Sequence, residues 1–319
     1  PPPCVCLNNK HYRTTFTKPI TVFLNSKLVV NVLGRFLVYL DVIKGRHIKS
    51  RRPKRIILIR HGQSEGNADP SIYERVPDNK LNLTSKGIGQ AHECGKKLGE
   101  MIGKESALFI LSPFNRTKQT YENIRAGLAE VAGADDEGRY YTREDPRVRE
   151  LEWGNFQETE QMENVLQTRN WCGRFYYRFH DGESGADVYD RASSFMESMF
   201  RGMDSVTRER RENVIIISHG LFMRLFLMRF LYWTVKEFES VWNPQNCDIW
   251  VLSRQEDGEF KLETELGRSG AATDDGTVPK EVVQGDLRRK ASFRPSYKGS
   301  PHLAPRFPDP DVLDNGGDG

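Results

Sequence analysis

The stretch Ile56–Ser64, IILIRHGQS, places a short apolar run directly before Arg-His-Gly. Later in the chain Val214–Gly220, VIIISHG, repeats the pattern. Short β-branched runs bounded by glycine are typical of buried strands. Each run therefore brings a histidine to the carboxyl end of a strand, where open α/β sheets build their ligand sites. Two histidines, an arginine and two glycines at such positions indicate a pocket for phosphate.

The composition is that of a folded protein with long polar flanks. The chain has 319 residues, of which 37% are hydrophobic, and a mean hydropathy of -0.62. Residues 1–54 contain eleven Lys and Arg residues but one acid, Asp41, so this arm carries +10. The net charge is +3, which leaves −7 for the remainder. A nucleic-acid-binding domain carries its basic patch on the fold, so we expect no nucleic-acid partner.

The five cysteines lie at irregular spacings, and only Cys4 and Cys6 are close together. No second cysteine pair completes a zinc-binding set. We therefore expect no metal site. Scattered single cysteines favour a reducing compartment over a disulfide-bonded scaffold.

The N-terminal arm contains the most membrane-like stretch of this region, residues 21–43. Polar side chains interrupt it, and its purest part, 28–40, is too short to cross a bilayer. We expect no stable membrane span. A basic arm poor in acids resembles an organelle transit peptide, and an unstructured extension is the favoured alternative. We expect a cytoplasmic protein, with organelle targeting by the arm as the other outcome.

Composition divides the chain into three parts: a basic extension over 1–53, a folded domain over 54–263 and a tail over 264–319. The tail is rich in Gly, Pro, Asp and Ser, which predicts disorder. Within it, the segment RRKAS that ends at Ser292 resembles the recognition site of a basophilic protein kinase. Ser292 is therefore a predicted phosphorylation site.

Hydrophobic periodicity predicts alternating helices and strands within the folded domain. A helix capped by Thr84 is expected over 85–103, with Ile88, Ala91, Gly95 and Leu98 on one face. The further expected elements are a strand over 108–111, a helix that begins near Arg116, an extended segment over 147–153, helices over 188–203 and 221–233, and a strand over 249–252. This alternation predicts a three-layer α/β/α sandwich with a mostly parallel central sheet.

Six sequence blocks, taken together and in this order, resemble the histidine phosphatase superfamily, which includes the cofactor-dependent phosphoglycerate mutases. The blocks are RHGQSEGN from Arg60, LTxxGxxQA from Leu83, SPxxRxxQT from Ser112, RExxxG from Arg149, GES from Gly182 and SHG from Ser218. The resemblance covers residues 54–253. It implies a phosphoglycerate mutase-like fold, and it makes the 54–263 domain catalytic.

The resemblance also implies roles for particular residues. Phosphoryl transfer needs a nucleophile, positive donors around the phosphoryl oxygens and an acid for the leaving oxygen. His61 is the candidate nucleophile, since imidazole forms a covalent phospho-intermediate and attacks when it is neutral. The candidate phosphate-binding groups are Arg60, Asn67, Arg116, His219 and Gly220, where the following helix adds its backbone amides.

Two carboxylates compete for the role of general acid and base. Glu150 precedes x-x-x-Gly in the fourth block, and Glu152 follows two residues later, on the same face if the segment is extended. The family block selects Glu150. This residue would protonate the leaving oxygen and later activate water.

Three departures from the mutases favour a phosphatase acting on a small-molecule phosphomonoester. The mutases have Trp where this chain has Gly66, and Asn-Ser where it has Leu221-Phe222. The stretch between Glu150 and His219 also looks shorter than theirs. An apolar lip at 221–222 would favour substrates with some hydrophobic surface. We expect neither metal nor organic cofactor.

Two alternatives stay open. A phosphoglycerate mutase would need a bisphosphorylated sugar acid to prime the nucleophile. An inactive relative that serves as a binding or regulatory module would be expected to lack one of the key site residues, and none is missing. The aromatic and basic run 171–179 is predicted either to cap the pocket and select substrate or to form a packed helix face.

Overall fold

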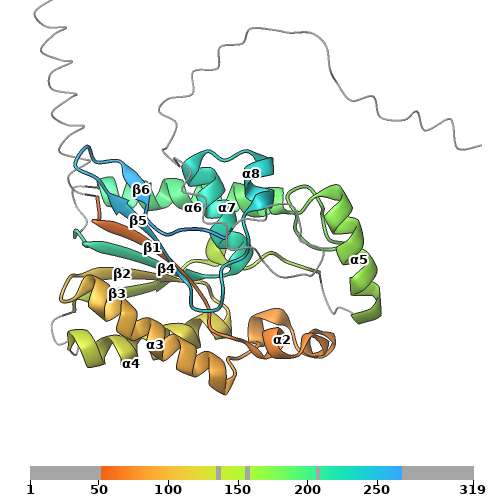
Figure 1. Cartoon of the computed structure of the whole chain (residues 1–319), viewed down its shortest axis with the longest axis horizontal. Helices are drawn as coiled ribbons and strands as arrows, with labels where there is room; N and C mark the ends of the chain where they lie inside the picture. The colour runs from red at the N-terminus through yellow and green to blue at the C-terminus, as the bar shows by residue number, and fades with distance from the viewer. Residues whose placement is uncertain (1–51, 134–137, 155–158, 206–208, 268–319) are drawn as a thin grey trace, which may run out of the picture.

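The computed structural model describes residues 52–133, 138–154, 159–205 and 209–267 (Figure 1). Its six-stranded sheet has the order β3-β2-β4-β1-β5-β6. The strands are β1 (Arg55–Arg60), β2 (Ala107–Leu111), β3 (Tyr140–Glu144), β4 (Asn213–Ser218), β5 (Ile249–Arg254) and β6 (Phe260–Leu262). Helices cover both faces of this sheet, as the sequence predicted, and the molecule is a three-layer α/β/α sandwich with a mostly parallel sheet.

The two strands that carry the histidines lie side by side in the centre of the sheet. β1 pairs with β4 in parallel, so that Arg60 lies opposite Ser218. β2 and β3 continue the parallel order beyond β4. Only β5 runs against its neighbours, pairing antiparallel with β1 on one side and with β6 on the other. The carboxyl ends of β1, β4 and β2 therefore meet at one edge.

Alternate side chains of β1 supply the two cores, as a period of two requires. Ile56 and Leu58 belong to the core beneath α6 (Gly185–Asp204) and α7 (Gly220–Leu231). Ile57 and Ile59 belong to the core beneath α3 (Ser85–Ile102) and α4 (Asn115–Ala132). All four side chains are fully buried, which explains why the run is continuously apolar.

Helices α3 and α4 pack with their backbones in close contact. A Cβ added at Gly127 would lie 2.0 Å from the carbonyl oxygen of His92, and one at Gly95 would lie 2.2 Å from that of Ile124. Both positions therefore exclude any side chain. The close packing fixes the start of α4, which carries Arg116, against the start of α3.

Several details differ from the sequence predictions. Ile88 is 45% exposed and does not belong to the buried face of α3. Helix α6 begins at Gly185, three residues before the predicted start, because Ser184 and Asp187 form a capping box there. The segment predicted to be extended over 147–153 opens with a 3-10 turn, η3 (Pro146–Val148).

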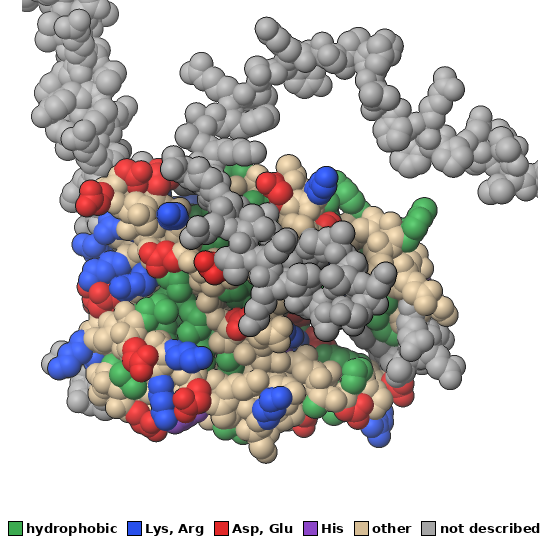
Figure 2. Space-filling model, in the orientation of Figure 1, with side chains coloured by type: hydrophobic (Ala, Val, Ile, Leu, Met, Phe, Trp, Pro, Cys, Tyr) green, Lys and Arg blue, Asp and Glu red, His purple; other side chains and the backbone are tan. Residues whose placement is uncertain are grey.

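The remaining elements are short or lie at the periphery. They are α2 (Glu65–Ala68), η1 (Pro70–Glu74), η2 (Asp78–Lys80), α5 (Thr159–Cys172) and α8 (Val235–Ser240). Within the described ranges, no helix is both long and apolar enough to cross a membrane. Acidic and basic side chains are interspersed on the face shown in Figure 2. Nearly all of the basic extension and of the tail, with Ser292, lies outside the described residues.

Candidate active site

The two histidines of the predicted pocket meet at the carboxyl edge of the sheet. β1 ends at Arg60 and β4 ends at Ser218, so His61 and His219 leave neighbouring parallel strands at the same level. Their ring centroids lie 5.1 Å apart. Both side chains are buried, with 3% and 0% exposure. The fold therefore pairs two imidazoles that the sequence separates widely.

One hydrogen bond defines the tautomer of His61. Its Nδ1 lies 2.7 Å from the carbonyl oxygen of Gly62. A carbonyl can only accept, so Nδ1 carries the hydrogen and Nε2 keeps its lone pair. Burial, followed by the charges of Arg116 and Arg60, lowers the pKa of His61 well below its usual value. The ring is neutral with a free Nε2, which is the nucleophilic form.

The backbone around His61 is held from three sides. The His61 amide donates to the carbonyl oxygen of Ser218 at 3.0 Å. Nδ2 of Asn246 donates to the His61 carbonyl at 3.0 Å, and the Gly62 amide donates to Oγ1 of Thr120 at 3.0 Å. Because neighbouring elements fix both peptide groups, the imidazole is positioned before any ligand binds.

His219 is the N-cap of α7, whose first turn contributes free backbone amides beginning at Gly220. Its Nε2 lies 2.8 Å from Oγ of Ser112, which follows β2. Nδ1 is buried and has no hydrogen-bond partner in the described part of the chain. Burial and the charge of Arg116 lower the pKa of His219 well below its usual value. This second imidazole is therefore also neutral.

Arg60 and Arg116 both lie beside His61, since the charge of each lowers its pKa. Nη1 of Arg60 donates to the carbonyl oxygen of Pro244 at 2.7 Å, and its Nε is buried without a partner among the described residues. Arg116, in the first turn of α4, is 3% exposed and forms an ion pair with Asp78 at 2.8 Å. Two guanidinium groups thus lie close enough to the His61 ring for their charges to act on it.

Asn67 is an exposed residue of α2, the short helix that follows the segment with His61. Its Oδ1 accepts from the Ser64 amide at 3.2 Å and from Nδ2 of Asn246 at 3.1 Å. Its Nδ2 donates no hydrogen bond within the described ranges, so the amide is oriented with a donor to spare. Asn246 therefore holds both the His61 backbone and the Asn67 side chain.

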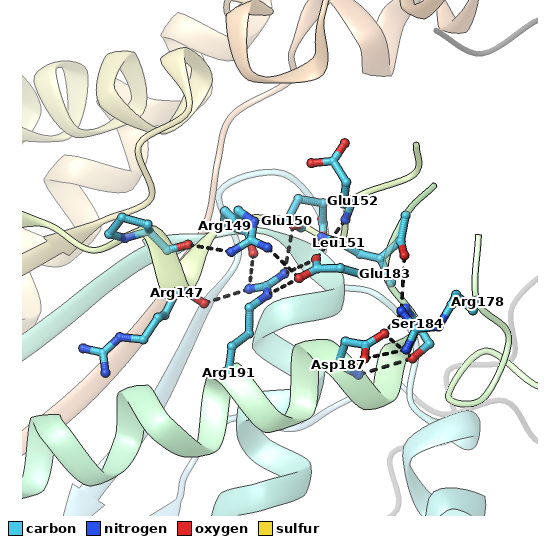
Figure 3. A network of polar contacts seen from close by, with 12 residues as sticks. Arg147, Arg149, Glu150, Leu151, Glu152, Arg178, Glu183, Ser184, Asp187 and Arg191 are labelled. Carbon is cyan, nitrogen blue, oxygen red and sulfur yellow. Dashed lines mark hydrogen bonds and ion pairs between the residues drawn. The ribbon is translucent and has the colours of Figure 1, made fainter. Parts of the chain in front are cut away.

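The two candidate acids differ in their surroundings. Burial raises the pKa of Glu150, while the positive charges of Arg116 and Arg60 oppose that rise. Burial, with the negative charges of Asp78 and Glu183, raises the pKa of Glu152. Glu150 therefore lies near Arg116 and Arg60, the two predicted phosphate-binding arginines. In Figure 3 the Glu152 carboxylate projects away from the polar network.

Arg191 of α6 holds the segment that carries Glu150 (Figure 3). Its Nε and Nη2 form a two-point pair with the Glu183 carboxylate, both at 3.0 Å. Nη1 donates to the carbonyl oxygens of Arg147 and Arg149, and Nη2 donates to that of Glu150, at 2.7 to 2.9 Å. The GES block thus acts through Glu183 and Arg191 on the backbone of Glu150.

Gly66, the second glycine of the first block, leaves room for the phenol ring of Tyr73. A Cβ at Gly66 would lie 2.5 Å from both Cζ and Oη of Tyr73, a residue of η1. Burial and the negative charge of Asp78 raise the pKa of Tyr73 to about 12. The charges of Arg116 and Glu150 also act on it. Tyr73 is therefore a neutral hydrogen-bond donor near the pocket, at the position where a Trp at 66 would clash.

The predicted apolar lip at 221–222 is wrong. Leu221 is 5% exposed and Phe222 is fully buried, and both belong to the core between α6, α7 and the sheet. The run 171–179 is mixed: Trp171 is 88% exposed, whereas Phe179 is buried and packs on Trp153 with ring centroids 4.6 Å apart. The end of this run therefore lies close to the Glu150 segment.

Sequence reasoning missed several residues that shape the site. Asp78, Tyr73, Ser112 and Arg191 lie in or between the blocks, and Asn246 lies after the last one; the fold brings all five to the pocket. Ser112 opens the third block and follows a predicted strand, so its position at the carboxyl edge of the sheet could have been predicted. No group of three His, Cys, Asp or Glu side chains in the described ranges could hold a metal ion.

Comparison with protein families gives a match over residues 56–265 to the model of the histidine phosphatase superfamily, branch 1. A phosphoglycerate mutase-like protein of Arabidopsis thaliana is 43% identical over 227 residues, which covers 66% of this chain and 78% of the relative. A broad-range acid phosphatase of Saccharomyces cerevisiae is 28% identical over 300 residues, covering 67% and 90%.

Among solved structures, a mycobacterial glucosyl-3-phosphoglycerate phosphatase resembles this chain with a TM-score of 0.51. The sequences are 21% identical, and the match covers 66% of this chain and 98% of the other. This likeness concerns the fold.

Proposed function

This chain belongs to the histidine phosphatase superfamily, and from that premise we propose that it hydrolyses phosphomonoesters through a phosphohistidine on His61. One observation carries the proposal: His61 is neutral, has a free Nε2 and lies beside two guanidinium groups. This combination serves phosphoryl transfer, because the nucleophile and the charges that stabilise the transition state are in place before the substrate binds.

In the first step Nε2 of His61 attacks phosphorus and the bond between phosphorus and the ester oxygen breaks. Glu150 gives its proton to that oxygen, and the alcohol leaves. The phosphorylated ring keeps its Nδ1 hydrogen, and the Gly62 carbonyl stabilises the positive charge that the ring acquires. Arg60, Arg116, Asn67 and the amides from Gly220 bind the phosphoryl oxygens.

In the second step the Glu150 carboxylate takes a proton from water, and the water oxygen attacks phosphorus. The P–N bond breaks, inorganic phosphate leaves, and His61 returns to its neutral form. His219 stabilises the phosphoryl group in both steps. Its buried, unpartnered Nδ1 supports this role, because a buried polar atom of this kind is normally satisfied by a ligand or water.

Water, rather than a second substrate position, is the proposed acceptor. Tyr73 fills the space beside Gly66 where the mutases carry Trp. The Glu150 side of the pocket also gathers the acidic groups Glu152 and Asp78. The charge of Glu152 disfavours the carboxylate and second phosphate of a bisphosphorylated sugar acid, whereas the charge of Asp78 is paired with Arg116. A phosphatase of small-molecule phosphomonoesters fits this arrangement better than a mutase.

The test is a paired assay on purified protein in the presence of a chelator. One arm measures phosphate release from a panel of phosphomonoesters, and the other measures interconversion of 2- and 3-phosphoglycerate with the bisphosphate primer. We expect release without interconversion, with loss of release in His61→Ala. His92→Ala is the matched control, since His92 lies on α3 and its side chain pairs with Glu130 of α4. Interconversion would establish the mutase instead.

A further inference from the structure

Arg116 is bound by a carboxylate that the sequence blocks did not include. Its Nη1 donates to Oδ1 of Asp78 at 2.8 Å, and its Nη2 donates to Oδ2 at 3.1 Å. Nη1 also donates to the backbone carbonyl oxygen of Asp78 at 2.6 Å. Asp78 opens the 3-10 turn η2, thirty-eight residues before Arg116. An arginine of the proposed phosphate-binding site is thus already ion-paired with a residue of the chain itself.

Counting donors shows what this pair leaves available. A guanidinium has five N–H groups in a fixed fork. Asp78 takes both hydrogens of Nη1 and one of Nη2. The two that remain, on Nε and Nη2, lie on a single edge of the guanidinium. Arg191 uses this same edge to bind the two carboxylate oxygens of Glu183. Among the described residues, one two-point fork of Arg116 therefore stays free for an oxyanion.

The surroundings of Arg116 leave its guanidinium little freedom to turn. The residue is 3% exposed. The Phe114 ring lies under the guanidinium carbon at 4.9 Å, and Oγ1 of Thr120 donates to the Arg116 carbonyl oxygen at 2.6 Å. Without Asp78, the Arg116 guanidinium would lose the ion-pair partner that defines its rotation within this enclosure.

We propose that Asp78 is a positioning residue, which fixes Arg116 so that its Nε–Nη2 edge faces the phosphoryl group. This inference rests on the proposed function, since it assigns a purpose to one arginine of that site. Asp78 does not touch the substrate. It presents Arg116 as a preformed two-point fork, and a planar guanidinium matches a phosphoryl group in this way.

The experiment compares Asp78→Ala and Asp78→Asn, in the full chain, with Asp69→Ala. Asp69 caps η1 on the same segment and forms no contact with Arg116, so it is the matched control. Two quantities are measured for each variant: kcat/KM for an aryl phosphate, and the Kd for inorganic phosphate by calorimetry. A misplaced catalytic group commonly costs up to about 100-fold in rate.

We expect Asp78→Ala to lose about 10- to 100-fold in kcat/KM and to bind phosphate more weakly by a similar factor. Asp78→Asn should be intermediate, because the amide keeps one acceptor for Nη1 but offers none to Nη2. In an Arg116→Ala background, Asp78→Ala should have no further effect on kcat/KM. This non-additivity separates positioning from a general loss of folding, which would act in both backgrounds.

Other outcomes would overturn the inference. Tighter phosphate binding by Asp78→Ala would show that the carboxylate competes with phosphate for Arg116. Unchanged kinetics and affinity would show that Arg116 needs no partner, and an additive loss in the Arg116→Ala background would show that Asp78 acts elsewhere. Failure of the wild-type chain itself to bind phosphate and release it from esters would instead reject the proposed function.

Discussion

Replacing Arg191 with methionine would keep much of the apolar stem of the side chain and remove its whole hydrogen-bonding head. The head makes five hydrogen bonds: two to the Glu183 carboxylate and one each to the backbone carbonyls of Arg147, Arg149 and Glu150. Arg191 and Glu183 have side chains that are 11% and 15% exposed, so water reaches these groups poorly.

The expected loss of stability follows from those contacts. Removing one partner of a buried ion pair costs about 3–5 kcal/mol. The loss here should lie in the lower part of that range for the pair itself, because Arg149 still binds Glu183 at 2.6 Å. The three carbonyl hydrogen bonds add about 1 kcal/mol each where water does not replace them. We expect Arg191→Met to lose about 3–6 kcal/mol, depending on how many of the three carbonyls water reaches, a large share of the about 5–15 kcal/mol typical of a domain.

Urea unfolding of the wild type and the variant, followed by far-ultraviolet circular dichroism, measures this loss directly. Arg178→Met is the control, since Arg178 also forms an ion pair, with Asp187 at 2.6 Å, but its side chain is 60% exposed. An exposed pair contributes at most about 1 kcal/mol. Equal stability of the Arg191 and Arg178 variants would refute the reasoning that burial makes the Arg191 network the stronger one.

Three further predictions concern catalysis. The kcat/KM profile should be bell-shaped: it rises as His61, whose pKa is lowered, loses its proton, and falls as Glu150, whose pKa is raised, loses its own. Glu150→Gln should abolish the falling limb. Gly66→Ala should raise KM by displacing Tyr73, and adding Tyr73→Ala should restore part of the loss. Ser112→Ala removes the hydrogen bond to His219 and should lower kcat/KM about 10-fold without changing KM, which steady-state kinetics will check.

Much of the fold could be predicted because its signals are local. The runs before His61 and His219 are continuously apolar since both faces of the central strands are covered, and the structure confirms them as neighbours. The cap at Thr84 likewise marks the start of α3. The prediction for 221–222 failed for a physical reason: α7 is buried on nearly all sides, so its sequence carries no polar face from which its orientation could be inferred.

The polar contacts of the site were harder to predict, because they join residues that are distant in the sequence. Asp78 of η2 contacts Arg116 only because the start of α4 packs beside the segment after α2. Arg191 faces the Glu150 segment only when α6 packs against it. No spacing rule connects such pairs. A buried arginine does predict that some carboxylate or carbonyl accepts its hydrogen bonds, but it does not predict which one.

The order in which the chain emerges from the ribosome gives the sheet arrangement a kinetic consequence. Among the strands of the described residues, β1 is made first, yet its two partners, β4 and β5, are the last of the long ones. Until they appear, the apolar run Ile56–Ile59 has both edges unpaired, a state that favours association with other chains. Nascent chains arrested before Asn213 should therefore remain sensitive to protease at β1. For a time during its synthesis, the strand that ends at His61 would depend on chaperones for protection.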